Sequence, residues 1–347
     1  MRLLIVTQAV DRNHPVLGFF HRWIQEFAAH CEQVEVITLF EGKHTLPKNV
    51  QVHSLGKEKE ERSSFSYALR FLRLVWKLRN EYDVVFVHMN VEYLLVAGWL
   101  WKTFRKRVAL WYTHGTVSWR LRLAAVFADI LFTASEASMR LRTSKKRVVG
   151  HGMDLRVTLM LPPPSGSLHL MTAGRVAPVK RLERMIEAVA ALRKEGSEVT
   201  FSILGGPVTP EDKVYEARLR LQVAELGLSE DIRLLGPQDL AGVRSELSHS
   251  HLFLHASETG SLDKAPLEAL AAGVPVVSTN PEIGGMVCAA YLADSKADGF
   301  LDALKQAISE RAWEDPQVRT GARTYVETTH ELSRLIPRIL ADLAQVS

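Results

Sequence analysis

Short runs of apolar, β-branched residues alternate along the first half of the chain with helix-like stretches and loops. Continuous apolar strands that alternate with helices are typical of a parallel sheet covered on both faces. We therefore expect a parallel sheet in this half. The strand-like runs are "RLLIVT" (2–7), "QVEVITL" (33–39), "DVVFVH" (83–88), "RVALWY" (107–112) and "DILFTA" (129–134).

A second series of the same kind follows the segment "TLMLPPPSGS" (158–167), whose three prolines and Ser/Gly tail are typical of a linker. We therefore predict an α/β protein with two tandem Rossmann-like, doubly wound domains, residues 1–157 and 168–328. Ligands are expected in a cleft between them, at the carboxyl ends of the strands. The second series is "LHLMTA" (168–173), "VTFSILG" (199–205), "DIRLLG" (231–236), "LFLHAS" (252–257) and "VPVVST" (274–279).

The end of the chain, residues 329–347, carries one apolar stripe at helical spacing. Such a stripe needs a partner, and we predict that this helix packs back on the first domain. The residues of the stripe are Leu332, Leu335, Ile336, Ile339, Leu340 and Leu343.

The cysteines and the apolar segments of the sequence predict a cytoplasmic protein. The two cysteines, Cys31 and Cys288, lie far apart and have no metal-type spacing, which favours a reducing compartment. The start of the sequence does not resemble a signal peptide, and "YLLVAGWLW" is about half the length of a membrane span. We expect a cytoplasmic protein, with peripheral attachment to the inner face of the cell membrane left open.

The charge is uneven: residues 1–155 hold 23 Lys and Arg against 14 Asp and Glu, whereas the rest holds 20 against 25. This asymmetry predicts a face of the first half that meets an anionic membrane or acceptor, and a solvated basic face is the alternative. Nucleic acid is not an expected partner, because no binding module for it is recognisable. The predicted face consists of Lys102, Arg105, Lys106, Arg107, Arg120 and Arg122.

The sequence lacks a GxGxxG loop after the first strand and a GxxxxGK[ST] motif anywhere, which argues against a dinucleotide dehydrogenase and a P-loop NTPase. Arg175 and Lys180 instead follow a strand and precede a helix, where two cations can clamp a diphosphate. Alone, such a pair is more often only solvated. The stretch "TGSLDKAPLEALAAG" (259–273) offers backbone N–H groups at a second helix start, and Glu268 can bind a ribose diol.

Several motifs together resemble family 4 of the retaining glycosyltransferases, whose architecture of two Rossmann-like domains is called GT-B. The resemblance implies that Arg175 and Lys180 neutralise the leaving nucleotide diphosphate and that Glu268 holds the ribose. It also implies that His114 lies near the donor sugar and acceptor, and that Gly18 lets the backbone approach the phosphates. The motifs are "YTHGTVS", "ADILFTASEASMRL", "GHGMD", "GRVAPVK", "LGLSEDIRLLG" and "LFLHASETGSLDKAPLEALAAGVPVVST".

The chain departs from that family at Gly260, where the motif has its first acid, which contacts hydroxyls of the donor sugar. We expect backbone amides from Ser261 through Leu262 to Asp263 to face the donor. Asp263 is the candidate to bind the sugar hydroxyls, and a helix cap is the alternative for it. Lys264 is expected either to add a third cation or to pair with Asp263.

These expectations define a retaining glycosyltransferase that needs neither cofactor nor metal, since cations and helix N-termini can stabilise the leaving diphosphate. The donor is expected to be a UDP- or GDP-sugar rather than an ADP-sugar. A basic, Trp-rich acceptor domain suits a lipid-linked acceptor in envelope glycan or polysaccharide synthesis. The alternatives are a non-catalytic nucleotide-sugar-binding subunit and a nucleotide-sugar epimerase of the same fold.

Overall fold

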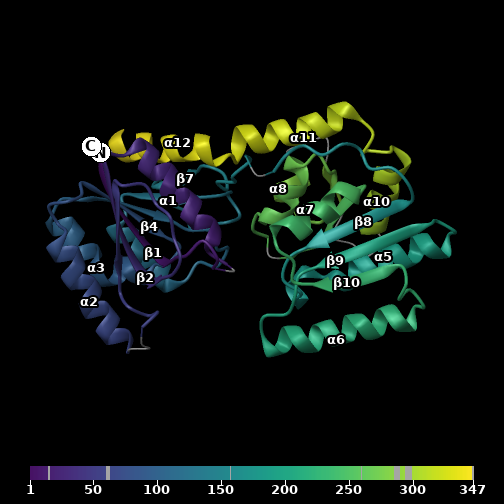
Figure 1. Cartoon of the computed structure of the whole chain (residues 1–347), viewed down its shortest axis with the longest axis horizontal. Helices are drawn as coiled ribbons and strands as arrows, with labels where there is room; N and C mark the ends of the chain where they lie inside the picture. Colours follow the sequence, from purple (N-terminus) through teal and green to yellow (C-terminus); the bar gives the residue numbers. More distant parts are fainter. Residues whose placement is uncertain are drawn as a thin grey trace. The chain divides into compact units, whose positions relative to one another are not determined.

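The computed structural model describes residues 1–14, 16–59, 63–156, 158–258, 260–284, 290–293 and 299–345. The chain forms two compact units, one of Met1–Asp154 with Thr329–Ser347 and one of Leu155–Thr328 (Figure 1). Each unit is built on one parallel sheet, so the predicted fold class of two α/β domains is confirmed. The cleft between them stays a prediction. Cys31 is a buried free cysteine, and Cys288 lies outside the described residues.

The sheet of the first unit has seven strands in the order β3-β2-β1-β4-β5-β6-β7, all paired in parallel. The order reverses between β1 and β4, which makes a topological switch point at the carboxyl edge. The strands are β1 (Arg2–Val10), β2 (Gln33–Glu41), β3 (Val50–Ser54), β4 (Val84–His88), β5 (Arg107–Trp111), β6 (Ile130–Thr133) and β7 (Lys146–Val148).

Both faces of this sheet are covered because successive side chains of a strand point to opposite faces. In β1, Leu3 and Ile5 join a core with α1 and α12, whereas Leu4 and Val6 join a core with α2, α3 and α4. This alternation explains why consecutive positions in the middle of β1 are all apolar. The helices are α1 (Gly18–His30), α2 (Ser64–Lys77), α3 (Glu92–Thr103), α4 (Trp119–Phe127) and α12 (Leu332–Gln345).

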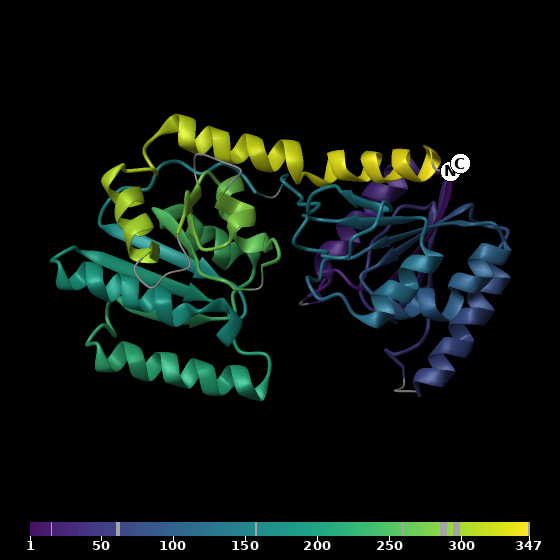
Figure 2. The ribbon, with the colours of Figure 1, turned by 180° about the vertical axis from the view of Figure 1, so that it is seen from behind.

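Helix α12 lies beside α1 in the first unit, as both views of the ribbon show (Figures 1 and 2). All six residues of its apolar stripe are buried in the core that includes Trp23 and Phe27. The guanidinium of Arg107 donates to the carbonyls of Leu343 (3.0 Å) and Ala344 (2.7 Å) near the end of the helix. A cation at this end also favours the helix dipole. The end of the chain therefore completes the first unit.

The sheet of the second unit has six strands in the order β10-β9-β8-β11-β12-β13, with its own switch point between β8 and β11. Its strands are β8 (Leu168–Ala173), β9 (Val199–Leu204), β10 (Ile232–Gly236), β11 (Leu252–His255), β12 (Val276–Ser278) and β13 (Ala290–Leu292). Its helices are η1 (Pro178–Lys180), α5 (Leu182–Lys194), α6 (Pro210–Glu225), α7 (Leu240–His249), α8 (Lys264–Ala271), α9 (Pro281–Gly284), α10 (Gly299–Ser309) and α11 (Pro316–Thr329).

The proline-rich segment 158–167, expected to link the domains, belongs to the second unit. The backbone N–H of Leu161 donates to the carbonyl of Ala272 (2.9 Å). Two arginines of α11 also hold the segment: Arg319 donates to the carbonyl of Leu161 and Arg323 to that of Thr158. Extended, proline-rich backbone leaves its carbonyls open to such donors. The boundaries between the units therefore fall at 154/155 and 328/329.

Candidate functional site

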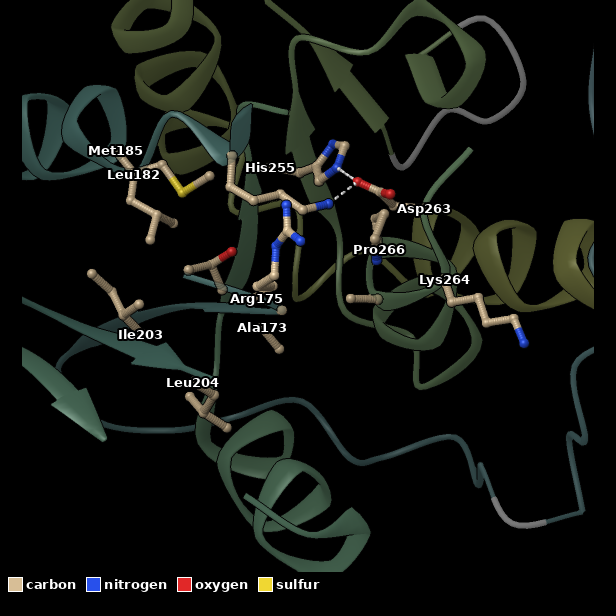
Figure 3. A pocket seen from close by; sticks show the side chains of 14 residues that line it. Ala173, Arg175, Leu182, Met185, Ile203, Leu204, His255, Asp263, Lys264 and Pro266 are labelled. Atoms are coloured by element: carbon tan, nitrogen blue, oxygen red, sulfur yellow. Dashed lines mark hydrogen bonds and ion pairs between the residues drawn. The ribbon is translucent and has the colours of Figure 1, made fainter. Parts of the chain in front are cut away.

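A polar pocket of about 200 Å³ lies at the carboxyl edge of the second unit's sheet, beside the switch point between β8 and β11 (Figure 3). Parallel strands end at the same edge, so the loop after β8, the end of β11 and the start of α8 meet there. The polar side chains that line the pocket are Thr172, Arg175, Lys180, His255, Asp263 and Lys264.

Arg175 lies on the loop after β8 with its side chain 48% exposed. Its Nε atom is 3.7 Å from a carboxylate oxygen of Asp212, which forms a capping box with Thr209 at the start of α6. Hydrogen bonds from the backbone of Thr209 and Val208, together with the charge of Arg175, lower the pKa of Asp212. A carboxylate with a lowered pKa thus lies beside Arg175. Sequence reasoning missed Asp212, because only the folded chain brings it there.

Lys180 ends the short helix η1, and its Nζ atom lies 2.6 Å from a carboxylate oxygen of Asp263. Pairing with Asp263 was one of the two roles expected of Lys264; in the structure Lys180 forms this ion pair, and Lys264 points away from it (Figure 3). Lys264 begins α8, whereas Asp263 lies just before the helix. The two neighbours therefore project in different directions, and Lys180 takes the place expected of Lys264.

Asp263 occupies the N-cap position of α8, but its side chain makes no capping hydrogen bond. The same oxygen that meets Lys180 lies 2.9 Å from Nε2 of His255. Burial alone would raise the pKa of this carboxyl, but the His255 hydrogen bond and the Lys180 charge outweigh it and hold the pKa well below its usual range. The capping alternative is therefore wrong, and Asp263 is the anionic centre of a polar cluster.

His255 closes this cluster from the end of β11. Its Nδ1 atom is 2.9 Å from the hydroxyl of Ser278, and the Ser278 oxygen also accepts from the backbone N–H of Asn280 (3.0 Å). An ionised carboxylate only accepts hydrogen bonds, so a neutral His255 carries its proton on Nε2. The amide of Asn280 donates to the carbonyl of Ser261 (2.8 Å), which fixes the loop before α8. Sequence reasoning missed His255, although a polar side chain at the end of an apolar strand was a signal.

The other residues predicted for the site around α8 lie in different environments from one another. Gly260 has φ = 65°, a left-handed conformation that glycine adopts without steric cost. Leu262 is buried, with 4% of its surface exposed. Glu268 is not one of the described residues that line the pocket. Burial raises the pKa of its carboxyl, and the positive charge of Lys264 opposes this shift. Burial lowers the pKa of Lys264 to about 8, and the charge of Glu268 opposes this shift.

Two predicted residues lie in the first unit. Gly18 begins α1, and a Cβ there would lie 2.9 Å from the carbonyl oxygen of Arg12, so a side chain would crowd this turn. His114 lies exposed on the loop after β5 with its ring edge-on to Tyr112, at a centroid distance of 5.4 Å. His114 lines a hollow of about 1130 Å³, called here the first-unit hollow. Other residues that line it are His14, Phe40, Lys57, Glu92 and Trp119.

Most cations of the predicted basic face contact other parts of the first unit. Lys102 pairs with Asp129, and Arg120 lies 3.2 Å from a carboxylate oxygen of Glu92. Lys106 donates to the carbonyl of Tyr82 (2.5 Å), and Arg107 binds the end of α12 as described above. Arg105 and Arg122 are exposed. The uncompensated charge of this face is therefore smaller than the sequence suggested.

Two parallel α/β units, one with a cationic pocket at the carboxyl edge of its sheet, define the GT-B class of fold. Residues 161–320 match the family model described as glycosyl transferases group 1, which confirms the resemblance for this part of the chain. The match lies almost wholly within the second unit and includes every residue of the pocket.

The curated proteins to which this chain is similar are also glycosyltransferases by name. The chain is 25% identical over 182 residues to D-inositol 3-phosphate glycosyltransferase of Jonesia denitrificans, covering 50% of this chain and 41% of that protein. It is 28% identical over 191 residues to the amylovoran biosynthesis glycosyltransferase AmsK of Erwinia amylovora, covering 51% and 45%. The chain thus spans less than half the length of these relatives.

Solved structures show the same fold. Anabaena HepE in complex with UDP matches with a TM-score of 0.78 at 16% identity, and the match covers 100% of both chains. The lipopolysaccharide outer core galactosyltransferase WaaB in its apo form matches with a TM-score of 0.71 at 16% identity, covering 99% of this chain and 100% of that one.

Proposed function

We propose that this protein is a family 4, retaining glycosyltransferase that moves a sugar from a UDP-sugar to an acceptor. The observation that carries the proposal is the cluster of Arg175, Lys180, Asp263 and His255 at the sheet edge, inside the segment that matches group 1 glycosyltransferases. The neighbour HepE, solved with UDP and with UDP-glucose, supports UDP as the nucleotide.

The pocket suits a leaving diphosphate. Arg175 is half exposed and its nearest carboxylate is 3.7 Å away, so its guanidinium has donors left for phosphate oxygens. Lys180 has three N–H donors, of which Asp263 needs one. Preorganised cations of this kind stabilise charge as it develops on the leaving group. We therefore propose that transfer proceeds without a metal ion or other cofactor.

Asp263 also suits the role of the missing motif acid at Gly260. One of its carboxylate oxygens holds Lys180 and His255, and the other projects away from both side chains (Figure 3). That second oxygen can accept hydrogen bonds from hydroxyls of the donor sugar. Retention of configuration would then follow a front-face displacement, in which the departing phosphate helps to deprotonate the acceptor, with His114 supporting charge near the reacting sugar.

A lipid-linked acceptor in envelope glycan or polysaccharide synthesis completes the proposal. The relative AmsK acts in amylovoran biosynthesis by its name. Helices α2, α3 and α4 expose apolar side chains, among them Trp76 (53%), Trp99 (53%) and Val126 (63%), and α4 also carries the exposed Arg122. Aromatic and basic side chains together favour a membrane surface. None of the described helices is both long and apolar enough to cross a membrane. The site of action would be the cytoplasmic leaflet.

The test is the release of UDP from UDP-sugars by the wild type and by the Arg175→Ala and Lys180→Ala variants. Each substitution removes a cation from the place where negative charge develops, so turnover is expected to fall by roughly 10²-fold or more. Lys213→Ala, which changes an exposed cation of α6 outside the pocket, is the matched control. If both pocket variants turn over at the wild-type rate at saturating donor, the assignment of the diphosphate site is wrong.

The alternative of a non-catalytic nucleotide-sugar-binding subunit rests on Gly260, where the motif acid is missing. Release of UDP separates this subunit from the enzyme, and thermal shift detects binding in both, since a ligand at 100 times its Kd adds about 2.7 kcal/mol of stability. Stabilisation by UDP-sugars without release of UDP would favour the subunit.

A further inference from the structure

The first-unit hollow opens at the carboxyl edge of its sheet, at the switch point between β1 and β4. Loops that follow four strands line it: they contribute His14 after β1, Lys57 after β3, Asn90 after β4 and His114 after β5. Open α/β sheets bind their ligands at such a point. The family match covers residues 161–320 only, so it assigns no ligand to this hollow.

Lys57 lies on the loop after β3, and this loop is fixed to the neighbouring strand β2. The N–H of Leu55 donates to the carbonyl of Thr38 (2.8 Å), and the N–H of Lys57 donates to that of Leu39 (3.1 Å). The guanidinium of Arg70, from α2, donates to the carbonyl of Leu55 (3.2 Å). The backbone that carries Lys57 is therefore held from two elements.

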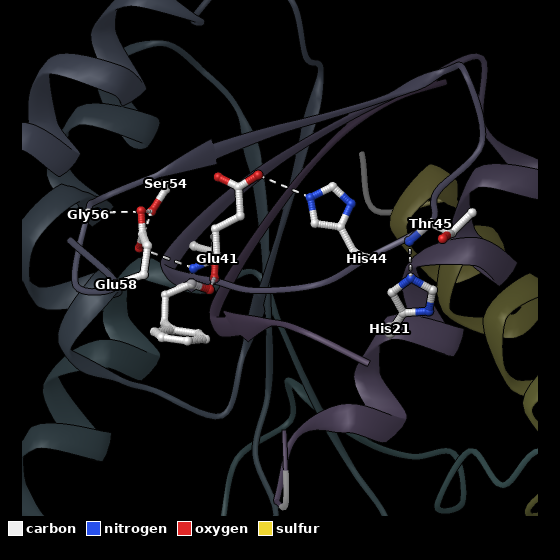
Figure 4. A network of polar contacts seen from close by, with 9 residues as sticks. His21, Glu41, His44, Thr45, Ser54, Gly56 and Glu58 are labelled. Carbon is white, nitrogen blue, oxygen red and sulfur yellow. Dashed lines mark hydrogen bonds and ion pairs between the residues drawn. The ribbon is translucent and has the colours of Figure 1, made fainter. Parts of the chain in front are cut away.

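Side chains reinforce the loop around Lys57 (Figure 4). The carboxylate of Glu58 accepts from the hydroxyl of Ser54 (2.8 Å) and from the N–H of Glu41 (3.2 Å). Burial would raise the pKa of Glu58, but the hydrogen bonds from its own backbone, Ser54 and Glu41 outweigh it and lower the pKa. Glu58 is thus occupied by these donors. A loop fixed in this way presents Lys57 in a preset place, which reduces the entropy lost on binding.

Among the described residues that line the hollow, Lys57 is a cation without an ion pair. Its side chain is exposed, and it forms no ion pair with the described residues. Arg120, which lines the same hollow, lies 3.2 Å from the carboxylate of Glu92. An anionic ligand in the hollow therefore gains most from Lys57.

A neutral donor accompanies this cation. Nδ1 of His14 accepts hydrogen bonds from the backbone N–H groups of Val16 (3.2 Å) and Leu17 (3.0 Å). An accepting Nδ1 places the ring proton on Nε2, which can donate to a ligand.

Trp119 provides an apolar platform in the same hollow. It is the first residue of α4, and 67% of its surface is exposed. The guanidinium of Arg120 lies 5.6 Å from its ring centroid. An exposed indole presents a wide, flat face, against which the C–H groups of a sugar ring can pack.

We propose that the first-unit hollow binds a saccharide that carries a phosphate group, with the phosphate at Lys57 and the sugar ring against Trp119. The proposal deepens the proposed function and rests on it for the identification of this ligand as the acceptor. A phosphate has enough oxygen atoms to meet both the ammonium of Lys57 and the N–H of His14.

Calorimetric titration with glucose 1-phosphate and with glucose tests the charge. The wild type is expected to bind glucose 1-phosphate at least tenfold more tightly, because a charged hydrogen bond is worth about one decade of affinity or more. Lys57→Ala should remove this preference, whereas Lys57→Arg should keep most of it. Lys59→Ala, which changes an exposed cation two positions away that does not line the hollow, should bind like the wild type. Equal affinities for both probes, or equal losses in the two alanine variants, would overturn the proposal.

A second pair of variants tests the platform. Trp119→Ala should weaken binding of both probes by similar factors. Trp99→Ala, which changes an exposed tryptophan of α3 outside the hollow, should weaken neither. Equal behaviour of the two variants contradicts the stacking. A phosphate-linked polyprenyl glucose in detergent micelles then compares the two sources of the group. If the protein binds the polyprenyl-linked glucose more tightly than glucose 1-phosphate, the acceptor is lipid-linked. If it binds the two with equal affinity, the acceptor is soluble.

The two proposals fail separately. Arg175→Ala is expected to weaken the binding of UDP and to leave the binding of glucose 1-phosphate unchanged, since the two sites lie in different units. A wild type that binds glucose 1-phosphate through Lys57 but never binds UDP refutes the proposed function alone. A wild type that releases UDP from UDP-sugars but does not bind either phosphate probe refutes the acceptor proposal alone.

Discussion

Asp263 is the residue whose environment differs most from its neighbours in sequence. One carboxylate oxygen meets both Lys180 and His255, and its side chain is 21% exposed. Lys264 and Ser261, on either side, do not take part in these two contacts. One carboxylate thus joins the loop before α8 to both η1 and β11, and its second oxygen is the proposed contact to the donor.

Asp263→Asn is expected to lower the free energy of unfolding by about 1–2 kcal/mol at pH 7, because it leaves Lys180 without its anion. The pKa of Asp263 is lower in the folded than in the unfolded state, so its contribution is present above the unfolded value of about 4 and is lost as the pH falls below it. Urea unfolding at pH 7 and pH 3.5 should therefore show a smaller difference from wild type at the lower pH.

The control for this variant is Glu230→Gln, which removes an exposed carboxylate outside the pocket. It should unfold like the wild type at both pH values. Turnover adds a second readout, since Asp263→Asn also removes a contact to the donor and should lower kcat by tenfold or more. An unchanged kcat together with lower stability would leave Asp263 with a structural role only.

At this scale the sequence predicted that Arg175 and Lys180 lie at one site, but not which residues they contact there. Arg175 and Lys180 stand in a recognisable motif and line the pocket. Asp212 and His255 could not be placed beforehand, because both come from other strand–helix units and reach the site only through the parallel order of the sheet. Contacts between distant residues have no local pattern that composition or periodicity can show.

Helix α8 is short, and its start shapes the site. Gly260 precedes it in a left-handed conformation, and an L-residue with a side chain pays about 1–2 kcal/mol there. This cost also explains why restoring the motif acid as Gly260→Glu would strain the loop.

Gly260→Ala is therefore expected to lower the free energy of unfolding by about 1–2 kcal/mol. Gly321→Ala makes the same chemical change inside α11, where a Cβ meets no atom within 4 Å. There it should stabilise the protein by about 1 kcal/mol, through helix propensity. Urea denaturation of both variants measures the contrast, and a stabilising Gly260→Ala would contradict the conformation described for the loop.

Among the elements, the ten predicted strands and helix α12, with its stripe of buried leucines and isoleucines, followed from the apolar pattern. The short strands β3, β7 and β13 were not predicted. The segment 158–167 did not follow from this pattern either. Its composition is that of a linker, but its backbone carbonyls bind Arg319 and Arg323, which lie about 160 residues further along the chain. Composition describes the local freedom of a segment, whereas its docking depends on partners elsewhere.

For the whole molecule, the excess of basic residues in the first half is the basis of the proposed membrane attachment. Arg105 and Arg122 are exposed and form no ion pair with the described residues, whereas the other four cations contact Asp129, Tyr82, Glu92 or the end of α12. The double variant Arg105→Ala/Arg122→Ala should lose about 2 kcal/mol of binding to anionic vesicles, or roughly thirtyfold.

Vesicle flotation measures this loss. Binding should weaken strongly at 1 M salt, where the screening length is about 3 Å. A double variant of the second unit, Lys213→Ala/Arg218→Ala, removes two exposed cations of α6 and should float like the wild type. Equally strong flotation with neutral and with anionic lipid would contradict an electrostatic contribution to membrane binding.

The second unit is one continuous stretch, whereas the first unit consists of two pieces that enclose it in the sequence. On the ribosome, residues 155–328 can complete their fold while the core around Trp23 still lacks α12. The half that is translated first is thus finished last. Until Leu335, Ile339 and Leu343 emerge, the nascent first unit exposes an apolar groove beside α1, which makes it a natural client for a chaperone.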